Sequence, residues 1–142
     1  MASYLMLERV ANAVIPTNAA VVFDSVVSVS GDQISYSTAT GEISFNAAGY
    51  YYIDWFAAPQ FGQTTDGSNF ALVSSGGAPA LTGSSHVRVS QTAGFAIVEV
   101  TVPGKTVQLI NTSDNSLTLS RFVTAKAALA VFSIASSEEP TE

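Results

Sequence analysis

The sequence contains no cysteine and few charged residues among its 142 positions. Without cysteine, the chain cannot form a disulfide framework, a thiolate metal site or a cysteine nucleophile. Charged residues make up 11% of the chain, well below the roughly one quarter that is usual for a soluble domain. A surface with so little charge is either buried in an oligomer or built from Ser, Thr, Asn and Gly.

Basic residues are especially scarce, and the formal net charge is −6. The five basic residues are Arg9, Arg88, Lys105, Arg121 and Lys126. Because they are scattered along the chain, they form neither a cationic surface for nucleic acid nor a polybasic patch for a membrane. No apolar run approaches the ~18–20 residues that a membrane-spanning helix needs. We therefore expect no nucleic-acid partner and no membrane insertion.

Nearly every segment has the composition of a β-strand, with turn residues recurring about every 8–12 positions. We predict strands over Ala19–Phe23, Val26–Ser30, Ile34–Ser37, Glu42–Asn46, Tyr50–Ala58, Phe70–Ser74, His86–Ser90, Phe95–Val102, Thr106–Asn111, Leu117–Ser120 and Lys126–Ile134. Ala2–Val10 is predicted to be a strand or an irregular lead-in. Such a series without a helix favours an all-β sandwich or jelly roll. We expect one domain over residues 1–137 and a frayed acidic tail over 138–142.

The segment GYYYIDWFAAP, Gly49 to Pro59, is unusually aromatic. Side chains alternate along a strand, which divides the segment into a core set (Tyr51, Ile53, Trp55) and an opposite set (Tyr50, Tyr52, Asp54, Phe56). The opposite set is either covered by a loop or forms a subunit interface. Aromatic enrichment at interfaces and the low charge favour the interface. A buried Asp54 would need a partner, for which Arg121 and Lys126 are candidates.

The pattern in ATGEISFNAAGYYYIDWFAA resembles the segment Gly-x-Ile-x-Phe…Gly-x-Tyr-x-Ile/Phe-x-Trp/Tyr of C1q-like and tumour-necrosis-factor-like jelly rolls. It matches at Gly41, Ile43, Phe45, Gly49, Tyr51, Ile53 and Trp55. GFAIVEVTVPGKTVQLINTSDNSLTL resembles the paired late strands of that family, and AALAVFSIAS resembles its closing strand. The Ala-, Val-, Ser- and Thr-rich style is most similar to the C-terminal domain of BclA-type bacterial collagen-like exosporium glycoproteins. Asp54 is not a family residue, and the 142 residues themselves contain no Gly-x-y repeat.

The resemblance implies a ten-stranded jelly roll that forms a homotrimer. Gly49, Tyr51, Ile53 and Trp55 would be core residues of the motif, while Tyr50, Tyr52, Asp54 and Phe56 would form the trimer interface. The implied function is that of a non-catalytic trimerisation head of a surface filament, structural or adhesive, on the outside of a bacterial cell or spore. Other surface-layer proteins and host glycans are the further partners that such a head implies.

Residues with catalytic or ligand-binding chemistry are sparse. The single histidine, His86, has no clustered nucleophile or metal ligand, and the acids form neither an EF-hand spacing nor a close pair. We expect no enzyme activity and no cofactor, with a calcium site near Asp66 or Asp114 as the minor alternative. Asn111-Thr112-Ser113 matches a glycosylation sequon, for which an ordinary turn is the favoured interpretation.

A ligand-binding jelly-roll head, lectin-like or a phage receptor-binding domain, is the alternative function. Jelly rolls place their ligands on loops. In this chain the ligand would bind at the loops Gln60–Asn69 and Ser74–Ser85, with Gln63, Asp66 and Asn69 as the candidate ligand residues.

Overall fold

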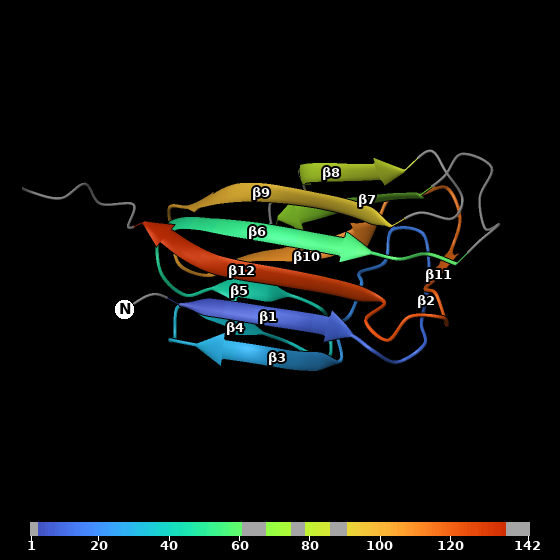
Figure 1. Ribbon diagram of the computed structural model, residues 1–142. Coiled ribbons are helices and arrows are strands. Elements are labelled where there is room, and N and C mark those ends of the chain that lie inside the picture. The colour runs from blue at the N-terminus through green and yellow to red at the C-terminus, as the bar shows by residue number, and fades with distance from the viewer. Residues whose placement is uncertain (1–2, 61–67, 75–78, 86–90, 136–142) are drawn as a thin grey trace, which may run out of the picture.

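The computed structural model describes residues 3–60, 68–74, 79–85 and 91–135. These residues form twelve strands. Ten of the strands build two five-stranded antiparallel sheets, which lie one behind the other in Figure 1. This arrangement confirms the predicted ten-stranded sandwich.

The first sheet has the strand order β3-β1-β12-β6-β9 and is nearest the viewer in Figure 1. Its members are β3 (Ser25–Ser30), β1 (Tyr4–Arg9), β12 (Ala127–Ala135), β6 (Gly49–Ala57) and β9 (Thr92–Val100). The last strand, β12, therefore pairs with the first strand on one side and with β6 on the other. A register shift between Met6 and Leu7 marks a bulge where β1 meets the edge strand β3.

The second sheet has the strand order β4-β5-β10-β7-β8. Its members are β4 (Ile34–Tyr36), β5 (Ile43–Phe45), β10 (Lys105–Asn111), β7 (Ser68–Ser74) and β8 (Pro79–Ser85). A short third sheet pairs β2 (Val14–Ile15) with β11 (Leu117–Thr118). In Figure 1 this pair lies at one end of the sandwich.

The space between the two large sheets is filled by one hydrophobic cluster. Its largest buried side chains include Trp55 and Tyr51 from β6 and Phe70 from β7. The Trp55 and Phe70 rings meet edge-to-face with their centroids 6.1 Å apart. Gly94 of β9 lies opposite Trp55 in the register, and an added Cβ there would come within 2.8 Å of the indole.

Most predicted strands are confirmed within one to three residues, but three corrections are needed. The two-residue strand β2 (Val14–Ile15) falls in no predicted strand. Ala19–Phe23 is not a strand: Ala20 forms an isolated bridge to Ile110, and the buried Val21 and Phe23 pack into the core. A strand at Pro79–Ser85 was missed because its proline and glycine resemble a turn. The predicted strand His86–Ser90 and the tail 138–142 lie outside the described residues. The described residues include no helix that is long and apolar enough to cross a membrane.

Candidate assembly face

The two faces of β6 differ as the alternation predicts. Tyr51, Ile53 and Trp55 are at most 2% exposed and belong to the core cluster. On the opposite face, Tyr50 and Asp54 are exposed, and Tyr52 and Phe56 are half-buried. The core set is therefore confirmed, while the opposite set is not buried within its own chain.

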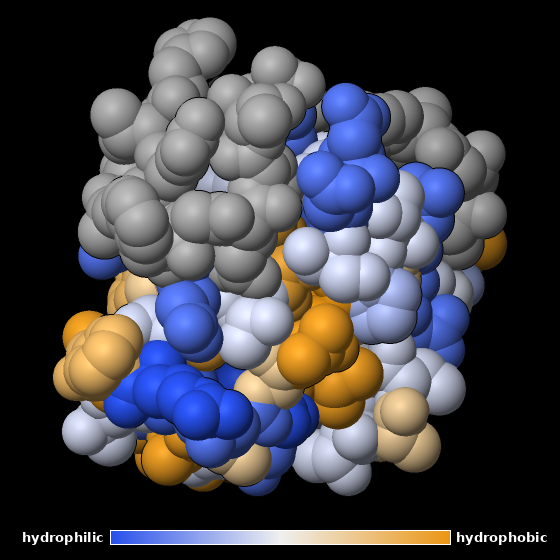
Figure 2. Space-filling view, turned by 90° about the vertical axis from the view of Figure 1, so that its right-hand side faces the viewer, coloured by the Kyte–Doolittle hydropathy of each residue, from blue (hydrophilic) through white to orange (hydrophobic). Residues whose placement is uncertain are grey.

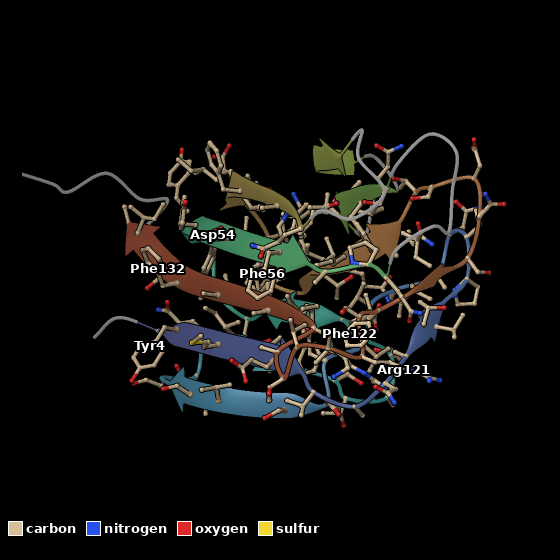
Figure 3. All side chains as sticks on the ribbon, turned by 45° about the vertical axis from the view of Figure 1, so that its right-hand side comes forward. Tyr4, Asp54, Phe56, Arg121, Phe122 and Phe132 are labelled. Carbon is tan, nitrogen blue, oxygen red and sulfur yellow. The ribbon has the colours of Figure 1, made fainter. Side chains whose placement is uncertain are left out.

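The exposed side of β6 continues across the neighbouring strands as a larger surface, which we call the outward face. Cross-strand register aligns its side chains in three rows: Tyr4–Phe132–Tyr52–Ile97, Met6–Ala130–Asp54–Phe95 and Glu8–Ala128–Phe56–Ala93. Tyr50 and Glu99 form a fourth pair beside these rows. Figure 3 shows Tyr4, Phe132, Asp54 and Phe56 along three neighbouring strands. Apolar side chains thus cover four adjacent strands.

The apolar side chains of the outward face are exposed to an unusual degree. Phe95 is 60% exposed and Ile97 is 66% exposed, and Phe132 and Tyr4 are each 43% exposed. The Tyr52 ring lies between two of these rings, with its centroid 5.3 Å from Phe132 and 6.2 Å from Phe95. Isolated exposed apolar residues are common, but a contiguous patch of this kind marks an interaction site.

The outward face is uneven. Phe95 and Ile97 project from the edge strand β9, whereas the central strand β12 carries only small side chains, Ala128 and Ala130, over part of its length. One hollow of about 470 Å³ lies over β1 and β12 and is lined by Tyr4, Met6, Ala130 and Phe132 with five further residues. A second hollow of about 180 Å³ lies between Met6 and Phe56 and includes Asp54 in its wall.

Sequence reasoning identified the β6 part of the outward face and missed the rest. Phe95, Ile97 and Phe132 were read only as members of alternating strands. The signal was present in GFAIVEV, Gly94 to Val100, where both alternating sets include bulky apolar residues. A strand with two apolar faces has a second surface to bury.

Neither candidate partner of Asp54 pairs with it in the described part of the chain. The Lys126 ammonium is buried and donates a hydrogen bond of 2.8 Å to the Val123 carbonyl. Arg121 lies in the loop at the far end of the sandwich from Asp54 (Figure 3). Asp54 is instead exposed to solvent in the single chain.

Of the predicted ligand residues, Gln63 and Asp66 lie outside the described residues, as does His86. Within the second predicted ligand loop, Ser74–Ser85, residues Pro79–Ser85 form strand β8 and not a loop. Asn69 is in strand β7 and not in a loop, and its backbone N–H and carbonyl bond the Ser113 hydroxyl at 2.8 and 3.1 Å. The described residues contain no group of three acids or histidines that could hold a metal, so Asp114 has no such cluster around it.

The sequon asparagine is a structural residue. Asn111 is 0% exposed, and its Nδ2 donates to the carbonyls of Ile15 at 2.9 Å and Asn115 at 3.1 Å. Its Oδ1 accepts from the Ser113 N–H at 2.9 Å. An amide enclosed in this way is inaccessible to a glycosyl transferase once the chain has folded, in agreement with the favoured interpretation.

The Asp24 carboxylate binds the backbone N–H groups that follow the end of β1. Asp24 accepts hydrogen bonds from the N–H groups of Val10 at 2.8 Å and Ala11 at 3.0 Å. Slight burial opposes ionisation, but these bonds and the nearby Arg9 charge outweigh it and lower the pKa of Asp24 below its ordinary value. Arg9 in turn donates to the Val22 carbonyl at 3.0 Å. In contrast, burial raises the pKa of Tyr51 and of Tyr36.

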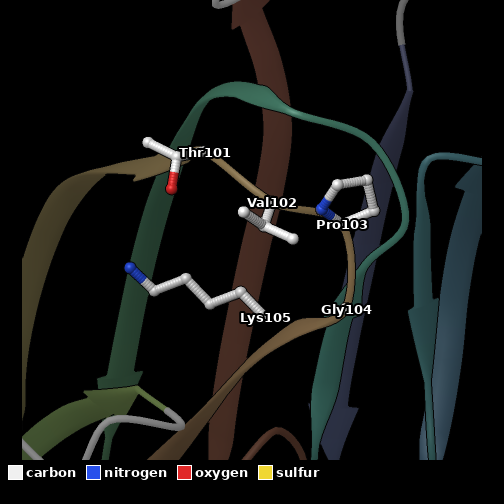
Figure 4. Close-up of a pocket in the computed structure, with 5 residues that line it drawn as sticks. All are labelled: Thr101, Val102, Pro103, Gly104 and Lys105. Carbon is white, nitrogen blue, oxygen red and sulfur yellow. The ribbon is translucent and has the colours of Figure 1, made fainter.

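Exposed apolar side chains also occur outside the outward face: Val14 is 62% exposed, Val102 is 70% exposed and Phe122 is 89% exposed. Figure 2 shows the end of the sandwich at the right of Figure 1, where strongly hydrophilic groups adjoin smaller hydrophobic ones. A hollow of about 330 Å³ lies at the β9–β10 turn and is lined by residues 101–105 (Figure 4). Lys105 is its charged residue, and the ammonium donates to the Glu99 carbonyl at 3.3 Å. This turn offers no nucleophile paired with a base.

Neither protein-family models nor curated proteins match this sequence, whereas solved structures do. The globular domain of zebrafish complement 1qA superposes with a TM-score of 0.65 at 16% identity, over 92% of this chain and 93% of that one. The fold is C1q/TNF-like. Murine APRIL matches with a TM-score of 0.72 at 11% identity, over 94% and 100% of the two chains. Eiger TNF from S. frugiperda matches with 0.67 at 12% identity, over 100% and 97%.

Proposed function

We propose that this chain is a non-catalytic head domain that joins two further copies of itself through the outward face to form a homotrimer. The observation that supports this proposal is the contiguous apolar surface over β1, β12, β6 and β9, which no other part of the described chain covers. The C1q/TNF-like fold supports this role, because this fold is one of non-catalytic domains.

The outward face spans four strands. At a spacing of about 4.8 Å, and with about 25 Å of usable length each, these strands cover roughly 480 Å² before side-chain relief is added. A standard interface buries about 800 Å² on each partner. Phe95 and Ile97 project from β9, whereas the larger hollow lies over β1 and β12. A head-to-tail contact can therefore place the β9 side chains of one copy in the hollow of the next. Head-to-tail contacts close into rings when the rotation between copies permits it.

We further propose an extracellular setting, as the head of a bacterial collagen-like surface filament of the BclA type. The support is the compositional resemblance and the low charge of 11%. We expect the genome to encode Gly-x-y repeats directly upstream of this domain. Neighbouring phage tail genes in place of such repeats would favour the receptor-binding alternative, which no feature of the described residues currently favours.

Tyr52→Glu tests the trimer. Tyr52 lies between Phe95 and Phe132, and in a three-fold assembly the substitution would bury three unpaired carboxylates, each costing several kcal/mol. At micromolar concentration we expect sedimentation equilibrium to give a trimer for the wild type and a monomer for the variant. Circular dichroism should show that both remain folded.

The matched control is Val102→Glu, because Val102 is 70% exposed on the β9–β10 turn and lies outside the outward face. This variant should remain trimeric. A monomeric wild type at micromolar concentration, or a Tyr52→Glu protein that stays trimeric and equally heat-stable, would contradict the proposal.

A further inference from the structure

Asp54 is the charged residue at the centre of the outward face. In the register it lies between Ala130 of β12 and Phe95 of β9. Its neighbours around the smaller hollow are Met6, Phe56 and Ala128. In the single chain the carboxylate is exposed and hydrated. Any partner that covers the outward face removes that hydration, and an ionised carboxylate in an apolar interface is costly unless it is paired.

Among the described residues, the titratable groups around Asp54 carry no positive charge. On the same strand β6 are Tyr50 and Tyr52, and the adjacent strand β9 carries Glu99, which accepts a hydrogen bond from the Tyr50 hydroxyl at 3.3 Å. Strand β1 contributes Glu8 and Tyr4. The outward residues of β12 are Ala128, Ala130 and Phe132, none of which titrates.

The basic side chains in the described residues are engaged elsewhere or lie at a distance. Arg9 and Lys126 donate to backbone carbonyls, and Lys105 donates to the Glu99 carbonyl at the edge of the sheet. Arg121 lies in the loop at the far end of the sandwich (Figure 3). Within the described residues, a second copy brings the same acids to the outward face and no base beside Asp54, so association there adds like charge to like charge.

We propose that association through the outward face takes up protons at Asp54, so that the trimer becomes tighter as the pH falls. This inference rests on the proposed homotrimer. A three-fold rotation repeats Asp54 three times at the same height along the axis, which adds mutual repulsion to the loss of hydration. A protonated carboxyl carries no charge and can donate a hydrogen bond, so the neutral form is the one that the interface accommodates.

The direction of the pH effect follows from linkage. The trimer holds its protons at pH values where the free chain has released them, so the trimer binds more protons than three free chains do. Association is then strongest at low pH and weakens as the pH rises. One to three protons taken up per trimer would give a slope of about −1 to −3 in the logarithm of the association constant against pH.

The test is sedimentation equilibrium of the wild type and of Asp54→Asn from pH 5.5 to pH 8.0 in the presence of EDTA. This range stays above the pI of about 4.5. We expect wild-type association to weaken at least tenfold across the range. The amide of the variant resembles the neutral carboxyl, so Asp54→Asn should associate at pH 8.0 at least as tightly as the wild type does at pH 5.5, with a flat pH profile.

Asp114→Asn is the matched control, because Asp114 is exposed in a turn outside the outward face. Asp114→Asn removes the same unit of charge as Asp54→Asn, so it measures the contribution of general charge repulsion in this acidic chain. We expect this variant to keep the wild-type slope of the association constant against pH. If Asp54→Asn kept the wild-type pH dependence, or weakened association at every pH, the proposal of proton uptake at Asp54 would be wrong. The proposed homotrimer would be unaffected by that result.

Two other outcomes separate the alternatives. A wild-type trimer that forms only when Ca²⁺ or Mg²⁺ replaces EDTA would overturn proton uptake, because a cation would then be neutralising the carboxylates. A wild type that stays monomeric at every pH, together with monomeric Asp54→Asn, would overturn the proposed function itself.

Discussion

The two faces of the first sheet contrast in what covers them. The inward face, with Tyr51, Ile53 and Trp55, is sealed by the second sheet of the same chain. The outward face, with Tyr52, Phe95 and Phe132, is nearly as apolar but exposed. One strand, β6, supplies both sets at alternating positions. The comparison teaches that hydrophobicity alone does not identify a core, because one apolar set is buried between the sheets and the other remains exposed in the single chain.

The largest effect should come from Trp55→Ala, which removes the bulkiest inward side chain. We expect the free energy of unfolding to fall by about 3–5 kcal/mol, or the chain to fail to fold. The matched change on the outward face is Phe95→Ala, which should alter the unfolding of the monomer by less than about 0.5 kcal/mol. Urea denaturation at concentrations where the chain is monomeric measures both. Equal losses would mean that the two faces do not differ as described.

Gly94→Ala should give an intermediate effect. The added methyl group would meet the Trp55 ring within 2.8 Å, and overpacking of this kind costs about 1–3 kcal/mol. Ala93→Ser, one residue earlier on the outward side of β9, is the control and should change thermal stability little. A Gly94→Ala protein as stable as the wild type would show that the indole can move aside.

Asp24→Asn should give the smallest effect, about 1 kcal/mol, because the carboxylate is largely exposed. The pKa of Asp24 is lowered in the folded chain, so its contribution is fully present above the ordinary carboxyl range near pH 4. It is lost as the pH falls through the lowered value. Thermal melts at pH 7 and pH 3 test this, because the difference from the wild type should shrink at the lower pH. A difference independent of pH would contradict the charge-assisted hydrogen bonds of Asp24.

Alternation predicted the division of β6 correctly, because the period of two is a local property of the backbone. Strand β8 escaped prediction because an edge strand tolerates proline and glycine, and Pro79–Ser85 is such an edge. The apolar character of Ala19–Phe23 predicts a strand. In the structure Val21 and Phe23 are buried in the core, but the segment forms only one isolated bridge and no ladder of strand hydrogen bonds. The exposure of Phe95 and Phe132 depends on which strands become neighbours, and pairing between distant segments is not encoded in any local pattern.

The position of β12 also orders events during synthesis of the chain. This strand lies between β1 and β6 in the sheet, although Ala127–Ala135 follow all the other strands in the sequence. Before β12 is synthesised, the first sheet is divided into β3 with β1 and β6 with β9. The rows of side chains that cross β12 cannot yet form. A nascent chain therefore lacks the outward face until β12 has been synthesised and has closed the sheet.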